Sequence, residues 1–262
     1  MDFERERDIG AMLAGRAGAV LLSHFCSRRF ESRQKGARDI VTTADIASEA
    51  VLMRGLTEAF PDDSVEAEEG GRVAANPSRV WYVDPLDGTV NYARGIPQWC
   101  VSIALFGDGV PLVGIIHDPI HGETLTAVSG RGAWRDGTLV PRRADVPLED
   151  ACVYLTIDVD DEGRHGGVED VAALAPHVSR TRSLGSVALG LAYTAVGRLD
   201  AVVHRSAHTW DYGAGVLLVR EAGGVVTDLS GEPYMAGTVA LIAAATPALH
   251  AELVALLREQ GS

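Results

Sequence analysis

A chain of 262 residues is long enough to bury a substantial core, either as one large domain or as two small ones. Its formal net charge of -13 argues against nucleic-acid binding as the main function, because phosphate backbones select for Lys and Arg. Three widely spaced cysteines without a CxxC pair indicate neither a disulfide framework nor a zinc cluster, so a reducing cytoplasm is the simplest expected location.

The N-terminal residues predict a packing helix followed by a basic segment. Apolar side chains recur at helical spacing over residues 4–25, with small residues between them that would let another helix approach closely. No uninterrupted apolar segment of the chain reaches membrane-spanning length, so we expect no membrane span. Residues 27–38 carry several arginines and Lys35, and this basic segment is either a solvated loop or a cover over an anion.

A second helix is expected over residues 46–60. Thr42 or Thr43 can cap it, and Asp45 suits the helix dipole in the first turn. Capping alone would explain why an aspartate stands at position 45.

Three glutamates lie on a short strand that is expected over residues 64–69. Alternation along a strand places Glu66 and Glu68 on one face and Glu69 on the opposite face. Such a group is commonly an exposed edge, but one of the three could face Asp84 across a sheet.

The most informative stretch is a short apolar run that ends in Asp84-Pro85-Leu86-Asp87-Gly88-Thr89. The run predicts a buried strand, which Pro85 would end, with Asp87 just beyond it in a turn. Two carboxylates held so close repel each other unless a cation lies between them. Ligation by oxygen atoms alone suits Mg²⁺, Mn²⁺ or Ca²⁺ rather than zinc. Asp-Pro and Asp-Gly are also ordinary turn sequences, so a simple turn is the alternative.

The middle of the chain predicts consecutive antiparallel strands. They are expected at 99–106, 111–117 and 123–128, with a tight turn at Gly107-Asp108-Gly109 and further turns at 130–137. These hairpins make this part of the sheet antiparallel.

The second half mixes strands and helices without a regular βαβ rhythm, which favours layered sheets over a doubly wound sheet. The helix that opens at Ser183-Leu184-Gly185-Ser186 has hydroxyls and amides at its start, which either bind an anion or simply cap the helix. Expected strands lie at 151–156, 200–204, 225–227 and 239–244, expected helices at 168–176, 183–197, 210–222 and 247–257, and an expected surface loop at 158–167.

Taken together, these motifs resemble one family. Asp84 to Thr89 is similar to its DP(I/L)DGT signature, and the other elements follow in the family's order along nearly the whole chain. They are Glu68-Glu69-Gly70 (paired glutamates), Asp39 to Asp45 (D-x-V-T-x-x-D), Trp210 to Gly215 (WDxxAG) and Glu221 to Gly224 (EAGG). The chain is identified as a member of the inositol monophosphatase family of Mg²⁺-dependent, lithium-sensitive phosphatases.

The resemblance implies an α/β fold, a layered α-β-α-β-α sandwich of the sugar-phosphatase type with a largely antiparallel N-terminal sheet. It implies one domain over residues 1–262, with sub-halves at about 1–145 and 146–262. The family is commonly homodimeric, and we expect a cytoplasmic homodimer.

The resemblance also implies the roles of site residues. Two or three Mg²⁺ ions, or Mn²⁺, would be held by Glu68, Asp84, the Leu86 carbonyl, Asp87 and Asp211. The implied catalytic residues are Glu68, Thr89 and Asp45, of which the last two orient the attacking water, and Lys35, which resembles a mobile lysine although its spacing is one residue short. The implied substrate contacts are Asp87, Gly88, Thr89, Asp211, His204 and the turn Gly185, Ser186 and Val187.

The chemistry explains why such a site needs metal. Phosphate monoesters hydrolyse extremely slowly without catalysis, and bound cations activate water, draw charge from the phosphoryl oxygens and stabilise the leaving alkoxide. Cations also explain how an acidic site accepts an anionic ester.

The substrate depends on one departure from the family pattern. Inositol-specific members have a glutamate seven residues before the WD aspartate, where this chain has His204, followed by Arg205. A neutral imidazole could accept one hydrogen bond in its place, a cationic His204 or Arg205 would favour a second anionic group, and His204 could also simply end a strand.

The expected substrate is a small phosphorylated polyol, an inositol monophosphate in the first place. Histidinol phosphate, a sugar phosphate or bisphosphate such as fructose 1,6-bisphosphate, and adenosine 3′,5′-bisphosphate stay open. So do a role in a specialised biosynthetic pathway and a regulatory or RNA-associated binding protein that retains the fold.

Overall fold

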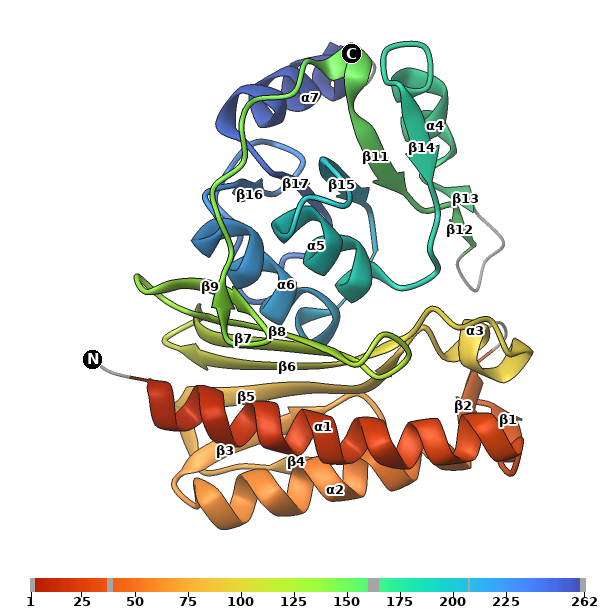
Figure 1. Cartoon of the computed structure of the whole chain (residues 1–262), viewed down its shortest axis with the longest axis vertical. Helices are drawn as coiled ribbons and strands as arrows, with labels where there is room; N and C mark the ends of the chain where they lie inside the picture. The colour runs from red at the N-terminus through yellow and green to blue at the C-terminus, as the bar shows by residue number, and fades with distance from the viewer. Residues whose placement is uncertain (1–2, 37–39, 160–164, 207, 260–262) are drawn as a thin grey trace.

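The computed structural model describes residues 3–36, 40–159, 165–206 and 208–259 (Figure 1). Asp39, with which the D-x-V-T-x-x-D element begins, lies outside these residues. The helices are α1 (Glu4–Ser27), α2 (Thr43–Ala59), α3 (Thr89–Arg94), α4 (Val168–Leu174), α5 (Val187–Ala195), α6 (Thr209–Glu221) and α7 (Pro247–Glu259), with a 3-10 turn at Leu148–Asp150.

The larger sheet has eight strands in the order β10-β9-β8-β7-β6-β5-β3-β4. Neighbouring strands are antiparallel throughout except β3 and β5, which are parallel. Its strands are β3 (Asp63–Ala67), β4 (Arg72–Val73), β5 (Asn76–Asp87), β6 (Cys100–Gly107), β7 (Val110–Asp118), β8 (Glu123–Val128), β9 (Gly132–Arg135) and β10 (Thr138–Leu139). The predicted antiparallel hairpins are confirmed.

The second sheet has five strands in the order β14-β11-β15-β17-β16, parallel over the first three and antiparallel over the rest. Its strands are β11 (Cys152–Leu155), β14 (Arg180–Arg182), β15 (Ala201–His204), β16 (Val225–Thr227) and β17 (Leu241–Ala244). Two small ladders join β1 (Ser32–Gln34) to β2 (Ile40–Thr42) and β12 (Asp158–Val159) to β13 (His165–Gly166).

Five layers alternate between helices and sheets (Figure 1). Helices α1 and α2 cover the outer face of the larger sheet, where Leu21 and Trp81 are fully buried. Helices α5 and α6 lie between the two sheets around Phe106 and Leu191, and α7 covers the outer face of the smaller sheet through Leu253. The expected α-β-α-β-α sandwich is therefore confirmed.

Helix α1 packs closely on the larger sheet because its small residues admit neighbouring side chains. A Cβ on Gly18 would lie 2.5 Å from the ring of His117 in β7, so the small residues face the sheet as well as leaving room for a helix. By length and composition alone α1 could cross a membrane, a test that core helices of globular proteins also pass. Its apolar stretch is interrupted by Arg16, and Leu13, Ala14 and Ala17 are buried in the fold.

The predicted end of the strand that carries Asp84 was wrong. Strand β5 continues through Pro85 to Asp87, and its pairing with β6 shifts register between Asp84 and Asp87. Proline lacks an N–H for the ladder, and such a shift is where a strand tolerates it. The register shift changes the direction in which Asp84 and Asp87 point, and it does not end the strand.

The predicted strand over residues 64–69 was too long. Strand β3 ends at Ala67, and Glu68 and Glu69 lie in the following turn, where the Glu68 N–H donates to the Val83 carbonyl (3.1 Å). The expected split of these glutamates between two faces was wrong, because strand alternation does not extend into the turn. Both carboxylates contact Lys35.

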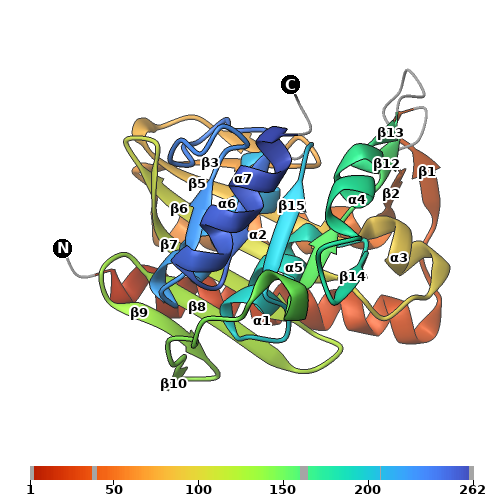
Figure 2. The same cartoon turned by 90° about the horizontal axis from the view of Figure 1, so that it is seen from above.

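Several shorter elements escaped prediction. The basic segment contains β1 and the expected turns at 130–137 contain β9, while the loop expected at 158–167 carries β12 and β13. In both views of the fold, α3, α4 and the two small ladders lie on the same side of the molecule, at the right of each picture (Figures 1 and 2). The three cysteines are free, in agreement with the expectation of no disulfide framework.

Candidate active site

Three carboxylates from separate elements converge beside the irregular part of β5. One oxygen from each of Glu68, Asp84 and Asp211 lies within 4.8 Å of the other two. Asp84 lies in β5 and is 1% exposed, Glu68 follows β3, and Asp211 lies in the first turn of α6. The sequence motifs that contain these residues are far apart along the chain, and the fold brings them together.

Local hydrogen bonds hold two of these carboxylates in place. The Leu86 N–H donates to Asp84 Oδ1 (2.9 Å), across the register shift of the strand. The His208 N–H donates to Asp211 Oδ2 (2.6 Å) as part of the capping of α6. The side chains are therefore oriented before any ligand arrives.

The cluster is electrostatically unfavourable on its own. Burial raises the pKa of Asp84 well above its usual value, and the charges of Glu68, Asp87 and Asp211 raise it further. Burial and the charge of Asp87 likewise raise the pKa of Asp211, and burial raises the pKa of Glu68 to about 7. A cation among these groups would relieve both penalties.

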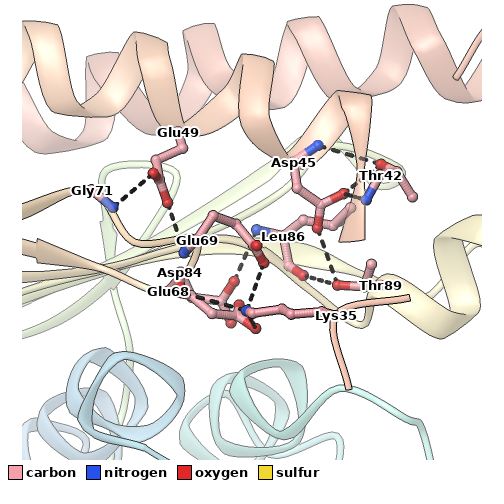
Figure 3. Close-up of polar contacts among 10 residues, drawn as sticks. All are labelled: Lys35, Thr42, Asp45, Glu49, Glu68, Glu69, Gly71, Asp84, Leu86 and Thr89. Carbon is pink, nitrogen blue, oxygen red and sulfur yellow. Dashed lines mark hydrogen bonds and ion pairs between the residues drawn. The ribbon is translucent and has the colours of Figure 1, made fainter. Parts of the chain in front are cut away.

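Lys35 supplies a positive charge to this acidic group (Figure 3). Its Nζ lies 3.3 Å from Glu68 Oε1 and 3.1 Å from Glu69 Oε1, and it also donates to the Glu68 carbonyl (3.4 Å). The ammonium lowers the pKa of Glu68 against the larger effect of burial. The predicted proximity of Lys35 to the cluster is therefore observed.

A hard divalent cation fits the donor set. Three side chains offer carboxylate oxygens, and the Leu86 carbonyl and Asp87 lie in the same irregular stretch of β5. Hard cations prefer oxygen ligands of this kind. Asp87 is not one of the three converging carboxylates, and its Oδ2 is bonded to α5.

The carboxylate of Asp87, the last residue of β5, lies at the N-terminal end of α5. Its Oδ2 accepts from Ser186 Oγ (2.5 Å) and from the Ala188 N–H (2.7 Å), while Ser186 Oγ caps the helix by accepting from the Leu189 N–H. The sequence left two roles open for the start of this helix, anion binding and simple capping. Ser186 caps the helix, and the carboxylate of Asp87 is the anion that accepts from its backbone N–H group. Val187 is the first residue of the helix, and it lines a cavity together with Ser186.

The hydroxyl of Thr89 and the carboxylate of Asp45 lie beside the three-carboxylate cluster (Figure 3). Thr89 Oγ1 lies 2.9 Å from the Leu86 carbonyl and 3.2 Å from Asp45 Oδ1. Asp45 also accepts from Thr42 Oγ1 and the Thr42 N–H in a capping box at the start of α2. Asp45 therefore both caps its helix and contacts Thr89, and burial raises its pKa to about 6.

Two glycines let β5 and the segment before α5 approach each other. Gly88 has φ +95° and Gly185 has φ +68°, and a Cβ on Gly88 would lie 3.3 Å from the Gly185 carbonyl and 2.8 Å from the Gln98 carbonyl. Asn91 in α3 joins the segment before β6 to the segment before α5 by donating to the carbonyls of Gln98 (2.8 Å) and Leu184 (2.7 Å). Sequence reasoning missed Asn91, since a single asparagine in a short helix carries no distinctive pattern.

A cavity of about 230 Å³ opens beside these residues, and its lining includes every predicted substrate contact except Gly88 and Thr89. The lining consists of Asp87, Tyr154, Thr156, Gly185, Ser186, Val187, His204, Ser206 and Asp211. Tyr154, Thr156 and Ser206 were not predicted, because isolated Tyr, Thr and Ser residues give no signal until the fold places them. Thr156 Oγ1 is buried and has no hydrogen-bond partner among the described residues.

His204 ends β15 and is 7% exposed. Its Nδ1 lies 2.8 Å from the Tyr212 hydroxyl, and the Ser206 N–H points to the same nitrogen at 3.4 Å. Arg205 is paired in two places with Asp170, Nε to Oδ2 and Nη2 to Oδ1, both at 2.6 Å. His204 therefore lines the cavity, whereas the Arg205 guanidinium is held by a buried aspartate.

The layered fold, the oxygen-only cluster and the adjacent hydroxyl define the class of metal-dependent phosphatases. The model of the inositol monophosphatase family matches residues 4–262, and the chain belongs to this family. It is therefore an enzyme, a phosphoric monoester hydrolase.

Individual relatives agree with this placement. The chain is 37% identical to inositol-1-monophosphatase ImpA of Mycolicibacterium smegmatis, over 87% of this chain and 83% of that protein. It is 39% identical to Nus factor SuhB of Xylella fastidiosa, over 82% and 78% of the two chains. The crystal structure of extragenic suppressor protein suhB from Bartonella henselae superposes with a TM-score of 0.90 at 31% identity, covering 96% of this chain and 98% of that one.

Proposed function

We propose that this phosphatase hydrolyses a small phosphorylated polyol, an inositol monophosphate in the first place, with Mg²⁺ held by Glu68, Asp84 and Asp211. The observation that carries the proposal is the convergence of these three carboxylates within 4.8 Å beside Thr89. We propose Asp87 and the Leu86 carbonyl as further ligands, for two or three ions, with Mn²⁺ as a substitute. Bound Mg²⁺ would supply the positive charge that activates water and stabilises the phosphoryl oxygens and the leaving alkoxide.

Thr89 and Asp45 are suited to orient the attacking water. A Thr89 hydroxyl that donates to Asp45 keeps a lone pair free to accept a hydrogen bond from water. The pKa of Asp45, about 6, lies close to neutral pH, where a general base is most effective. Lys35, at the cluster, would offset the negative charge of the phosphate.

The cavity supports a neutral leaving group. Thr156, His204 and Ser206 line the cavity and would offer polar groups to a substrate hydroxyl. Arg205 pairs with Asp170 through two hydrogen bonds, which argues against its use for a second phosphate. These features favour a polyol monophosphate over a sugar bisphosphate or adenosine 3′,5′-bisphosphate.

A panel of phosphate esters tests the proposal. Phosphate release would be measured with and without Mg²⁺ on inositol monophosphates, histidinol phosphate, sugar mono- and bisphosphates and adenosine 3′,5′-bisphosphate. We expect Mg²⁺-dependent release that is fastest on an inositol monophosphate. Release that is independent of Mg²⁺, or a clear preference for a bisphosphate, would contradict the proposal.

Substituting His204 tests how the cavity selects its substrate. We expect His204→Glu to raise kcat/KM for inositol monophosphates relative to the other esters, because a carboxylate accepts hydrogen bonds from two ring hydroxyls. His177→Glu is the matched control, since it adds the same charge at an exposed histidine of the C-terminal half. An unchanged preference in His204→Glu would show that position 204 does not select the substrate.

Several relatives bear the name Nus factor SuhB, which keeps the regulatory binding role as the alternative of another class. The converging carboxylates support the enzymatic role instead. Recovery of a stoichiometric macromolecular partner, with no hydrolysis of any ester in the panel, would favour the alternative.

Domain organisation, oligomeric state and location are also proposed from the family resemblance. We propose a single domain that unfolds as one unit, a homodimer and a cytoplasmic location. Calorimetry with one unfolding transition and light scattering at twice the chain mass would support the first two proposals.

A further inference from the structure

Helix α2 contacts the turn that carries Glu68, the irregular part of β5, and Thr89 at the start of α3. The contacts come from Asp45, Ser48 and Glu49, which lie on one face of the helix because they are three and four residues apart. Asp45 bonds to the Thr89 side chain, whereas Ser48 and Glu49 bond to backbone groups.

Glu49 bonds to the turn that presents Glu68 (Figure 3). Its Oε2 accepts from the Glu69 N–H (2.9 Å) and its Oε1 accepts from the Gly71 N–H (3.1 Å). A Cβ on Gly71 would lie 2.7 Å from Glu49 Oε1, so the missing side chain allows this close approach. The carboxylate therefore ties both ends of the turn to a rigid helix by charge-assisted hydrogen bonds.

Ser48 bonds to the irregular part of β5. Its hydroxyl is fully buried and donates to the Pro85 carbonyl at 2.9 Å. Pro85 lies between Asp84 and Asp87, where the pairing of β5 with β6 shifts register. A side chain of α2 thus holds a backbone carbonyl of the strand at the position between the two aspartates.

We propose that Ser48 and Glu49 are positioning residues for the metal site, and we call this pair the α2 clamp. The turn after Glu68 contains two consecutive glycines and Asp84 lies at the register shift of β5, so the hydrogen bonds from α2 restrain the two backbone segments that carry these carboxylates. The α2 clamp holds the turn and the strand against one helix, and thereby fixes the spacing of the two carboxylates before metal binds. This inference rests on the proposed metal site.

Two measurements test the clamp without relying on catalysis. Amide hydrogen exchange at Glu69 and Gly71 in the metal-free protein reports whether Glu49 holds the turn. Mn²⁺ titration followed by electron paramagnetic resonance gives the affinity of the site. The variants are Glu49→Ala, Glu49→Gln and Ser48→Ala, and Glu58→Gln is the matched control on an exposed part of the same helix.

In Glu49→Ala we expect faster exchange at both amides and a Kd for Mn²⁺ that rises about tenfold or more. Glu49→Gln should show a smaller loss, because the amide retains one acceptor oxygen and turns an N–H group toward the other backbone donor. Ser48→Ala should weaken Mn²⁺ binding in the same direction, and Glu58→Gln should bind as the wild type does.

Wild-type Mn²⁺ affinity in Glu49→Ala would overturn the proposal. If that variant does not fold, wild-type affinity in both Glu49→Gln and Ser48→Ala would overturn it equally. Asp84→Asn separates this outcome from a failure of the proposed function. Mn²⁺ binding that survives Asp84→Asn contradicts the metal site itself, whereas binding that is lost in Asp84→Asn but unaffected by Glu49 variants contradicts only the clamp.

Discussion

Replacing Glu68 with Gln is expected to stabilise the metal-free protein at pH 8. Burial raises the pKa of Glu68 from 4.5 to about 7, and the attraction of Lys35 offsets only part of this effect. A carboxyl with a higher pKa in the folded chain than in the unfolded chain binds more protons when folded. The free energy of unfolding therefore falls as the pH rises from 4.5 to about 7, and Gln, which does not ionise, avoids this loss.

The size of the effect follows from the same values. A shift of one pKa unit corresponds to about 1.4 kcal/mol, so a rise from 4.5 to about 7 corresponds to a free-energy cost of at most roughly 4 kcal/mol. The side chain is 22% exposed, and solvent screening reduces the expected gain to about 2 kcal/mol. Since 1 kcal/mol corresponds to about 2–4 °C in a chain of this size, Tm should rise by about 4–8 °C.

Differential scanning calorimetry in EDTA at pH 5 and pH 8 measures this gain. Glu66→Gln is the matched control, because it removes the same charge from the neighbouring strand β3. With Mg²⁺ present, we expect the wild type to gain more stability than Glu68→Gln, since the variant has lost a ligand. A metal-free Glu68→Gln that is no more stable than the wild type at pH 8, or that gains equally at pH 5, would refute the reasoning.

Substitutions at three further residues have defined outcomes. Thr89→Ala should lower kcat by about 10²–10⁴ at saturating Mg²⁺ while Thr89→Ser retains most activity, and equal activity in the two would contradict a role for the hydroxyl. Asn91→Ala leaves the carbonyls of Leu184 and Gln98 without their donor, so urea unfolding should show a loss of about 1–3 kcal/mol and steady-state kinetics a raised KM. Ser186→Ala removes the cap of α5 and a donor to Asp87, so we expect a loss of about 1 kcal/mol in the same unfolding experiment, and no loss would show that the cap is replaced.

The fold could be predicted from the sequence where local pattern and tertiary packing agree. The apolar runs and the Gly107-Asp108-Gly109 turn indicated β6 and β7. Thr42 or Thr43 was expected to cap a helix over residues 46–60, and Thr42 caps α2, which begins at Thr43. Prediction failed at Pro85, which usually ends a strand but here lies in a register shift that only the pairing with β6 reveals. It failed again after Ala67, because the contacts of Glu69 with α2 decide where β3 ends.

The acidic residues of the candidate site could be predicted from the sequence, but the residues that hydrogen-bond to the backbone around the site could not. Glu68, Asp84 and Asp211 stand in motifs that are recognisable along the chain, and the fold brings them together. Glu49 and Asn91 have no such signal, because each acts by bonding to backbone groups that are distant in the sequence. Their roles depend on three-dimensional proximity, which composition and periodicity do not encode.

The central claim is that the acidic cluster beside β5 binds the catalytic metal. Anomalous diffraction from a crystal soaked in Mn²⁺, recorded at the manganese absorption edge, tests this claim directly. We predict a strong anomalous peak between the carboxylates of Glu68, Asp84 and Asp211 that is absent from Asp84→Asn. A wild-type crystal with no peak there, or a peak that persists in the variant, would contradict the claim.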